Sequence, residues 1–371
     1  MMKLHLFNPE HDMALAYNDP YFTAPHAGRQ MRADLGFLPA LWADDGDMVW
    51  VDDVEAALER VRHFKKYAAD VVFVADCDLR RIFQEQDPVL VSGGSPSLEI
   101  APWGWDSALR QQLKRLGVSE LYLPKKELIA DIREISSRRF SSAVLADLMM
   151  LDDAYVGESC YVETLDEVEK LLTCWRHIVV KAPWSCSGRG IRYVKDEIPV
   201  AVGNWMTNVM RQQGGVMVEP YYNKVIDFGM EFMAHDDAVD YVGLSLFETI
   251  NGAYAGSVLA SEDDKRRMLT RHLSPMMTNQ LIERLKSVIA RHLGGRYQGP
   301  LGVDLMLVMS GDALRVHPCV EINLRRTMGH VAIALTPALP GARELMRITW
   351  EGARYHLRIQ PMNNYLKTEI L

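Results

Sequence analysis

The sequence lacks the features that mark secreted, membrane-embedded and nucleic-acid-binding proteins. Its five cysteines are odd in number and form no C-x-x-C pair, which argues against a disulfide framework and a zinc ribbon. It has no run of about 18 apolar residues, and its first residues, MMKLHLFNPEHD, reach charge and proline too soon for a signal peptide. A formal net charge of −8 offers no broad basic surface to nucleic acid or to an anionic membrane. We therefore expect a soluble, cytoplasmic protein with neither of these partners.

The composition that is present is typical of a large globular protein. The chain has 371 residues, of which 48% are hydrophobic and 24% are charged, so it is long enough for two or three packed units. No repeat or low-complexity tract divides it, and no pattern reveals its oligomeric state.

Residues 1–135 alternate strand-like and helix-like segments. The apolar runs KLHLF, MVWVDD and VVFVAD are separated by segments such as EAALERVRHFKKY, which has apolar residues on one helical face. Asp106 is the predicted N-cap of a helix that ends at Gly117. This alternation predicts a parallel sheet covered by helices, and hence an α/β first domain.

The pattern changes after residue 135. The helix-like segments SSRRFSSAVLADL and LDEVEKLLTCW are followed by the long strand-like segments FGMEFMAH, AVDYVGLSLFETI and AYAGSVLA, which predict an antiparallel sheet. A helix is expected near residues 275–293, and a hairpin between residues 302 and 325. The second part therefore has an α+β core.

The stretch VVKAPWSCSGRGIRYV, residues 179–194, places Lys181 at the end of a predicted strand and before a glycine-bearing loop. Gly188 and Gly190 allow the backbone to approach a ligand closely, and backbone N–H groups beside an ammonium group suit a polyphosphate. Because the lysine precedes the glycines, this is not a Walker A loop. Taken alone, a lysine at such a position is more often a surface residue than a ligand.

Two acidic strands form the second candidate site. Glu321 and Asn323 are two residues apart on a predicted strand, so their side chains leave the same face. If the segment SGDALR closes the hairpin, Asp304 lies roughly opposite Glu321 and three oxygen donors converge on one face, as Mg²⁺ favours. Arg325 continues this face. The alternative is a solvated outer face, and in either case the other face is apolar: Leu305, Leu307, Ile322 and Leu324.

The third stretch, VMVEPYYNKVIDFGMEF, runs from a strand through Glu219 and Pro220 into a connector. Proline cannot donate to a sheet ladder, so we expect the backbone around Tyr221 and Tyr222 to be free to bind a planar group. A plain turn is the alternative.

In this order and at these separations, the three stretches resemble the ATP-grasp superfamily over about residues 136–340. The resemblance implies a Rossmann-like N-terminal domain at residues 1–135, an ATP-grasp N-subdomain, or lid, at residues 136–215, and a C-subdomain with the metal site at residues 216–371. This sequence reads EINLR where many members have proline after the asparagine, which affects the expected geometry of that loop.

The resemblance also implies roles for individual residues. Lys181 would contact the α- and β-phosphates under the Ser185–Gly190 loop, Glu219–Tyr222 would hold adenine, and Asp227 would lie near the ribose. A further basic residue on the phosphates would be Arg139, with Arg138 as its competitor. The residues assigned to ATP are then Arg139, Lys181, Ser185, Ser187, Gly188, Gly190, Glu219, Tyr221, Tyr222 and Asp227. Those assigned to Mg²⁺, with Mn²⁺ as an alternative, are Asp304, Glu321 and Asn323. Arg325 and Lys181 would stabilise the transferring phosphoryl group.

The reaction implied by this resemblance is ATP- and Mg²⁺-dependent joining of a small-molecule carboxylate to an amine, or a thiol, through an acyl phosphate. A kinase that phosphorylates another acceptor and a protein that binds ATP without turnover are the alternatives. No pattern identifies the acid or the acceptor.

The segment NPEHD, residues 8–12, is a weaker candidate. Asn8 as N-cap, Pro9 at the first helical position and Glu10 in the first turn predict an ordinary helix start. The less frequent alternative is that His11 is a ligand or borders the acceptor site. Open α/β sheets bind ligands at the carboxyl ends of their strands, and this segment follows the first predicted strand.

Overall fold

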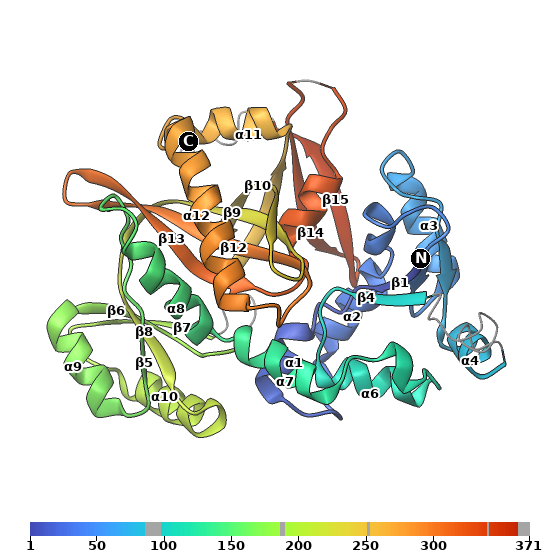
Figure 1. The fold of residues 1–371 in the computed structure, drawn as a ribbon, viewed down its shortest axis with the longest axis horizontal. Helices are drawn as coiled ribbons and strands as arrows, with labels where there is room; N and C mark the ends of the chain where they lie inside the picture. Colours follow the sequence, from blue (N-terminus) through green and yellow to red (C-terminus); the bar gives the residue numbers. More distant parts are fainter. Residues whose placement is uncertain (86–97, 186–189, 251–252, 340, 363–371) are drawn as a thin grey trace. The chain divides into compact units, whose positions relative to one another are not determined.

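The computed structural model describes residues 1–85, 98–185, 190–250, 253–339 and 341–362 (Figure 1). The chain divides into two compact units. The first contains Met1–Arg133 together with Val331–Thr336 and Leu345–Gln360, and the second consists mainly of Glu134–His330.

The first unit contains a four-stranded sheet in the order β3-β2-β1-β4, in which every neighbouring pair is parallel. Its strands are β1 (Met2–Leu6), β2 (Met48–Trp50), β3 (Val72–Val74) and β4 (Leu98–Pro102). Its α-helices, with α7 reaching the unit boundary, are α1 (His11–Tyr17), α2 (His26–Leu35), α3 (Val54–Val61), α4 (Asp76–Glu85), α6 (Ser107–Arg115) and α7 (Lys126–Ile135). Short 3-10 helices are η1 (Leu38–Leu41), η2 (Arg62–Phe64) and η3 (Glu120–Tyr122). The predicted parallel α/β sheet is confirmed.

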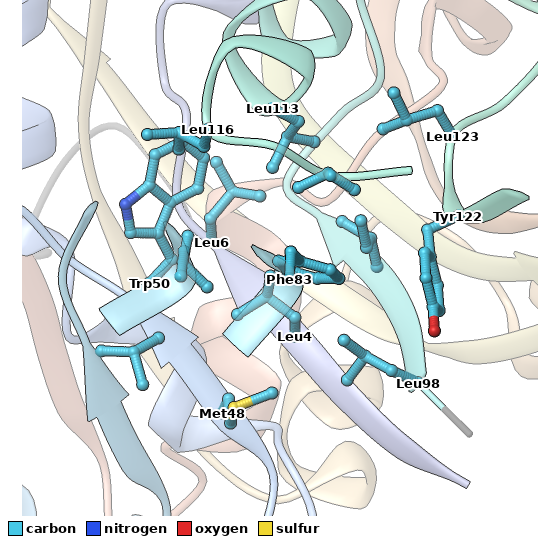
Figure 2. Close-up of a cluster of buried hydrophobic side chains, with 14 of the residues drawn as sticks. Leu4, Leu6, Met48, Trp50, Phe83, Leu98, Leu113, Leu116, Tyr122 and Leu123 are labelled. Atoms are coloured by element: carbon cyan, nitrogen blue, oxygen red, sulfur yellow. The ribbon is translucent and has the colours of Figure 1, made fainter. Parts of the chain in front are cut away.

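The core of this unit lies between the sheet and its helices. Side chains from β1, β2 and β4 converge with those of α4 and α6 in one cluster of buried residues (Figure 2). Leu4 and Leu113 in this cluster are fully buried. The alternating apolar runs of the sequence thus supply the sheet side of the core.

Two helix starts in this unit give opposite outcomes. Asp106 is the N-cap of α6, where its Oδ1 accepts a hydrogen bond from Leu109 N at 2.8 Å, as predicted. The prediction that Asn8 caps α1 is wrong, because that helix begins at His11 and the Asn8 amide donates to Gly104 O at 2.9 Å. His11 is buried, with Nδ1 3.3 Å from Asp106 Oδ2.

The second unit contains a smaller antiparallel sheet in the order β5-β8-β6-β7. Its strands are β5 (Cys160–Val162), β6 (His177–Lys181), β7 (Ile191–Lys195) and β8 (Val216–Pro220). Helix α8 (Arg138–Met149) precedes it, and α9 (Leu165–Trp175) and α10 (Val200–Gln213) contribute to its core. A capping box between Thr164 and Glu167 fixes the start of α9.

The same unit contains five strands of a larger sheet, in the order β13-β12-β9-β10-β11. They are β9 (Asn223–Ala234), β10 (Val239–Ile250), β11 (Ala253–Leu259), β12 (Gly299–Ser310) and β13 (Ala313–Asn323), and each neighbouring pair is antiparallel. The remaining elements of the chain are α11 (Glu262–Leu269), α12 (Pro275–Leu293), α13 (Met328–Ala334), β14 (Glu344–Glu351) and β15 (Arg354–Pro361). The helix expected near residues 275–293 and the hairpin are both confirmed.

Two further sequence expectations concern thiols and membranes. The cysteines that the structure describes are all free: Cys77, Cys160, Cys174 and Cys319. Within the described ranges, every helix is too short or too polar to cross a bilayer.

Candidate functional site

One face of the large sheet carries the predicted cation ligands in ordered rows. Asp304 on β12 pairs with Glu321 on β13 and with Gly229 on β9. Residues directly opposite each other in a sheet share a face, so the predicted juxtaposition of the two carboxylates is found. The side chains expected on the opposite, apolar face are buried, which agrees with that expectation: Leu305, Leu307, Ile322 and Leu324.

Two neighbouring rows extend this face in both directions. On one side Met306 pairs with His317 and with Asp227, the residue expected near the ribose. On the other side Gly302 pairs with Asn323 and with Glu231. We call these the Met306 row, the Asp304 row and the Gly302 row.

The electrostatics of the Asp304 row favour a cation. Burial, followed by the charges of Glu321 and Glu231, raises the pKa of Asp304 to about 8, and Arg325 opposes this rise. Carboxylates held this close repel one another unless one is protonated or a cation lies between them. The side chains of Asp304 and Glu321 are therefore suited to a hard divalent ion.

The donor set for such an ion is small. Among the described residues no group of three or more His, Cys, Asp and Glu side chains is arranged to hold a metal. The candidate donors are therefore limited to the carboxylates of Asp304 and Glu321 and the side-chain amide of Asn323. That amide donates to Asp304 Oδ2 at 3.3 Å, and its oxygen accepts from Arg325 Nη2 at 3.1 Å. Hard oxygen ligands that leave open positions fit Mg²⁺, which usually keeps waters and binds phosphate oxygens as well.

Lys181 ends β6 and is buried. Its Nζ lies 2.6 Å from Glu219 Oε2 on the adjacent strand β8, and Glu219 Oε1 accepts a weaker hydrogen bond from Ser159 Oγ at 3.3 Å. The surface-lysine interpretation is therefore wrong, since the ammonium group is enclosed in an ion pair.

Arg138 connects the lysine strand to the acidic strand. Its guanidinium donates to Ala182 O at 2.7 Å, to Ser185 Oγ at 2.8 Å and to Glu321 Oε2 at 2.8 Å. The loop after Lys181 and the acidic strand therefore lie next to each other. Arg139, the residue first assigned to the phosphates, lies instead over the ring of Tyr161, 4.2 Å from its centroid.

The described part of the loop after Lys181 is closely packed. A Cβ at Gly190 would collide with the side chain of Ser185, and Gly190 O accepts a hydrogen bond from Ala182 N at 2.8 Å. Glycine is thus required where the returning strand crosses Ser185. The predicted ligands Ser187 and Gly188 lie outside the described residues.

The connector after β8 differs in part from expectation. Pro220 pairs with Ile178, and Tyr221 N donates to His177 O at 2.9 Å, so the expectation of a free backbone is wrong for this N–H. The ring of Tyr221 stacks on His177 at 3.9 Å, whereas Tyr222 meets the ring of His317 edge-on at 5.5 Å.

Asp227 and His317 lie at the two ends of the Met306 row. Asp227 Oδ2 accepts from Lys224 Nζ at 2.5 Å and from Thr249 Oγ1 at 3.2 Å. His317 is buried without a hydrogen-bond partner for either ring nitrogen among the described residues. Its pKa falls to about 3, first because of burial and then because of the nearby Lys181. The imidazole is therefore neutral.

No family model and no curated protein matches the chain. A solved structure from Archaeoglobus fulgidus, assigned to the ATP-grasp superfamily, has a TM-score of 0.51 and 16% sequence identity, and the match covers 98% of this chain and 100% of that one. The fold is that of the ATP-grasp superfamily. The predicted resemblance is confirmed at the level of the fold.

Two other solved structures match with lower TM-scores. N5-carboxyaminoimidazole synthetase from Staphylococcus aureus, complexed with ADP, has a TM-score of 0.48 at 12% identity, with 94% of this chain and 82% of that chain covered. N5-carboxyaminoimidazole ribonucleotide synthetase from Thermus thermophilus has a TM-score of 0.48 at 13% identity, with coverages of 99% and 95%.

Sequence reasoning missed one cluster of this ATP-grasp fold. Glu231 Oε2 accepts from Thr327 Oγ1 at 2.8 Å and lies 3.0 Å from His330 Nδ1, and both Glu231 and His330 are buried. The signal was present, because Asp227, Gly229 and Glu231 alternate along β9 and break its apolar pattern on one face.

Gly329→Ala is expected to destabilise the protein. A Cβ at this position would collide with Glu231 Oε1 and lie 2.8 Å from Ser245 Oγ. Overpacking of this kind typically costs about 1–3 kcal/mol, which urea unfolding would register as a lower midpoint. Gly203→Ala is the matched control, since a Cβ there meets only Ile198 Cγ2 at 3.7 Å. Equal midpoints for the two variants would contradict the prediction.

Proposed function

We propose that the protein is an ATP- and Mg²⁺-dependent ligase that joins a carboxylate to an amine, or to a thiol, through an acyl phosphate, releasing ADP and phosphate. The observation that carries the proposal is the contact set of Arg138, which holds Ser185, in the loop after Lys181, and Glu321, beside Asp304, at one site. Triphosphate binding needs both the cations and the metal-binding acids there. The ATP-grasp fold supports the same conclusion.

Each residue then has a proposed role. Lys181 binds the α- and β-phosphates beneath the Ser185–Gly190 loop, the segment Glu219–Tyr222 holds adenine, and Asp227 binds the ribose. Arg138, which already contacts the loop, is a stronger candidate for the second phosphate cation than Arg139. Arg325 faces the transferring phosphoryl group, where a planar cation stabilises developing charge.

The metal site consists of Asp304, Glu321 and Asn323. These residues would hold Mg²⁺, which would supply positive charge to offset the negative charge that accumulates on the phosphates. The chain's own groups hold the triphosphate in line with the acid: Lys181 and Arg138 on the phosphates, and Arg325 at the γ-phosphoryl group.

The proposed reaction has two balanced steps. A carboxylate oxygen of the substrate bonds to the γ-phosphorus while the bond from that phosphorus to the ADP oxygen breaks, giving acyl phosphate and ADP. The amine nitrogen then bonds to the acyl carbon, the carbon–oxygen bond to phosphate breaks, and the nitrogen loses a proton. No protein nucleophile takes part, because ATP supplies the activation.

The domain assignment follows the same proposal. Residues 1–135 form the domain that precedes the ATP-grasp core, residues 136–215 its lid and residues 216–371 its metal-binding part. Two segments of the last part, Val331–Thr336 and Leu345–Gln360, belong to the first compact unit of the structure. We place the enzyme in the cytoplasm, with small molecules as its substrates.

Trapping with hydroxylamine tests this proposal. Purified protein is incubated with MgATP, hydroxylamine and a panel of small carboxylic acids, and we expect hydroxamate and ADP to form in equal amounts with at least one acid. Omission of Mg²⁺ is the control. A stable phosphorylated product without hydroxamate would indicate the kinase alternative, and nucleotide binding without ADP release would indicate a protein that binds ATP without turnover. Either result contradicts the ligase.

A further inference from the structure

Glu231 lies at one end of the face that carries the acids. It belongs to the Gly302 row, next to the Asp304 row and on the opposite side from the Met306 row. Since the Met306 row contains Asp227, proposed near the ribose, the Gly302 row lies at the end of the face farther from the nucleoside. A buried carboxylate at this place has no part in the roles proposed above.

The Glu231 carboxylate holds the segment that follows the acidic strand. Its Oε2 accepts the hydroxyl hydrogen of Thr327. The oxygen of that hydroxyl in turn accepts hydrogen bonds from Gly329 N at 3.1 Å and His330 N at 3.4 Å, at the start of α13. Thr327 therefore links Glu231 on β9 to the first turn of the helix.

Two glycines leave space for this carboxylate. A Cβ at Gly302 would lie 2.6 Å from Glu231 Oε2, and one at Gly329 would collide with Glu231 Oε1. Real Cβ atoms do not approach this closely, so both positions admit only glycine while Glu231 keeps its place. The packing is thus built around the carboxylate from β12 and from α13.

The segment held in this way carries Arg325. Only Leu324, Arg325 and Arg326 separate the end of β13 at Asn323 from Thr327. Arg325 donates to Asn323 Oδ1 and, at 2.9 Å, to Arg326 O. Fixing both ends of so short a segment restricts the positions that the guanidinium reaches.

We propose that Glu231 and Thr327 form a positioning pair that anchors residues 324–327 and so holds Arg325 toward the phosphoryl group in transfer. This rests on the proposed function. The pair acts through Arg325 and contacts no reactant. A small misplacement of a group that acts on the transition state lowers the rate more than it weakens binding.

The test compares three variants of the full chain. Thr327→Val removes the hydroxyl at nearly constant volume, Thr327→Ser keeps it, and Thr278→Val is the matched control, because Thr278 is a buried threonine in α12 whose hydroxyl donates to Ser274 O. We expect Thr327→Val to lower kcat about 10- to 100-fold while the Kd for a non-hydrolysable ATP analogue with Mg²⁺ stays within about 2-fold of wild type. Thr327→Ser, which keeps the hydroxyl, should have a kcat close to that of wild type, and so should Thr278→Val.

Hydrogen exchange gives a second readout that does not depend on turnover. The backbone amides of residues 324–330 should exchange faster in Thr327→Val than in wild type, and at the wild-type rate in Thr278→Val. Unchanged kcat in Thr327→Val, a parallel loss of kcat and ATP affinity, or failure of Thr327→Ser to restore kcat would overturn the positioning pair. Absence of ADP release from wild type would overturn the proposed function instead, while normal exchange of residues 324–330 in Thr327→Val would overturn the pair alone.

Discussion

Asp304→Asn is expected to abolish turnover and to make the unliganded protein more stable. The carboxyl group of Asp304 is half-buried beside Glu321. Burial and the negative charges of Glu321 and Glu231 raise the pKa of Asp304 to about 8. Asparagine keeps the shape but removes the charge, so a carboxylate ligand is replaced by a neutral amide oxygen. The gain in unfolding free energy should be on the order of 1–3 kcal/mol near pH 8, measured by urea unfolding with EDTA, and ADP release should disappear.

The pH dependence of this gain has a definite sign. A carboxyl whose pKa is raised in the folded state holds a proton that the unfolded chain releases from about pH 4 upward, so wild-type stability falls as pH rises from about 4 to about 8. The variant lacks this dependence, and the difference between the two proteins should grow across that window.

Asp312→Asn is the matched control for this variant, because Asp312 lies in the exposed turn between the same two strands. It should change neither turnover nor stability. Retained turnover in Asp304→Asn would remove the cation site, and a loss of stability near pH 8 would contradict the electrostatic account.

Lys181→Met is expected to lower the free energy of unfolding by about 3–5 kcal/mol, because it leaves the carboxylate of Glu219 buried without its cation. It should also lower kcat by about 100- to 1000-fold, as loss of one contact to developing charge does in other enzymes. Urea unfolding and ADP release measure the two effects.

The double variant Lys181→Met, Glu219→Gln separates the two effects. Removing both charges should restore most of the stability, since no uncompensated charge remains buried, but it should not restore turnover. A double variant with wild-type turnover would show that Lys181 has only a structural role.

The acidic hairpin could be predicted because local rules determine it. The alternation of apolar and polar residues assigns each side chain to a face, so Asp304 and Glu321 could be placed on the same face from the sequence. Their direct pairing could not, because the register of the short turn between β12 and β13 would place Asp304 opposite Cys319, and an irregularity between Asp304 and Met306 shifts its partner to Glu321. The turn contains Gly311 at φ +61°, a conformation that favours glycine.

Contacts between distant segments could not be predicted in the same way. Arg138 and Arg139 are adjacent on one helix, and only the packing of α8 decides which of them meets Ser185 and which meets Tyr161. Asparagine is a residue type that often caps helices, but the side-chain amide of Asn8 donates a hydrogen bond to the backbone oxygen of Gly104, 96 residues away. Glu231 was missed because its partners come after β13: Thr327, which is 96 residues away in the sequence, and His330 in α13.

The internal ion pairs of the site have a consequence for ligand selection. Before any nucleotide arrives, Glu321 is neutralised by Arg138, and Lys181 by Glu219. A ligand that carries only one sign of charge would have to break a pair and leave one member without compensation. A metal–triphosphate complex supplies both signs together, so an exchange of partners can satisfy all four side chains. We therefore expect the proposed nucleotide site to discriminate against free phosphate and against free cations before any chemistry begins.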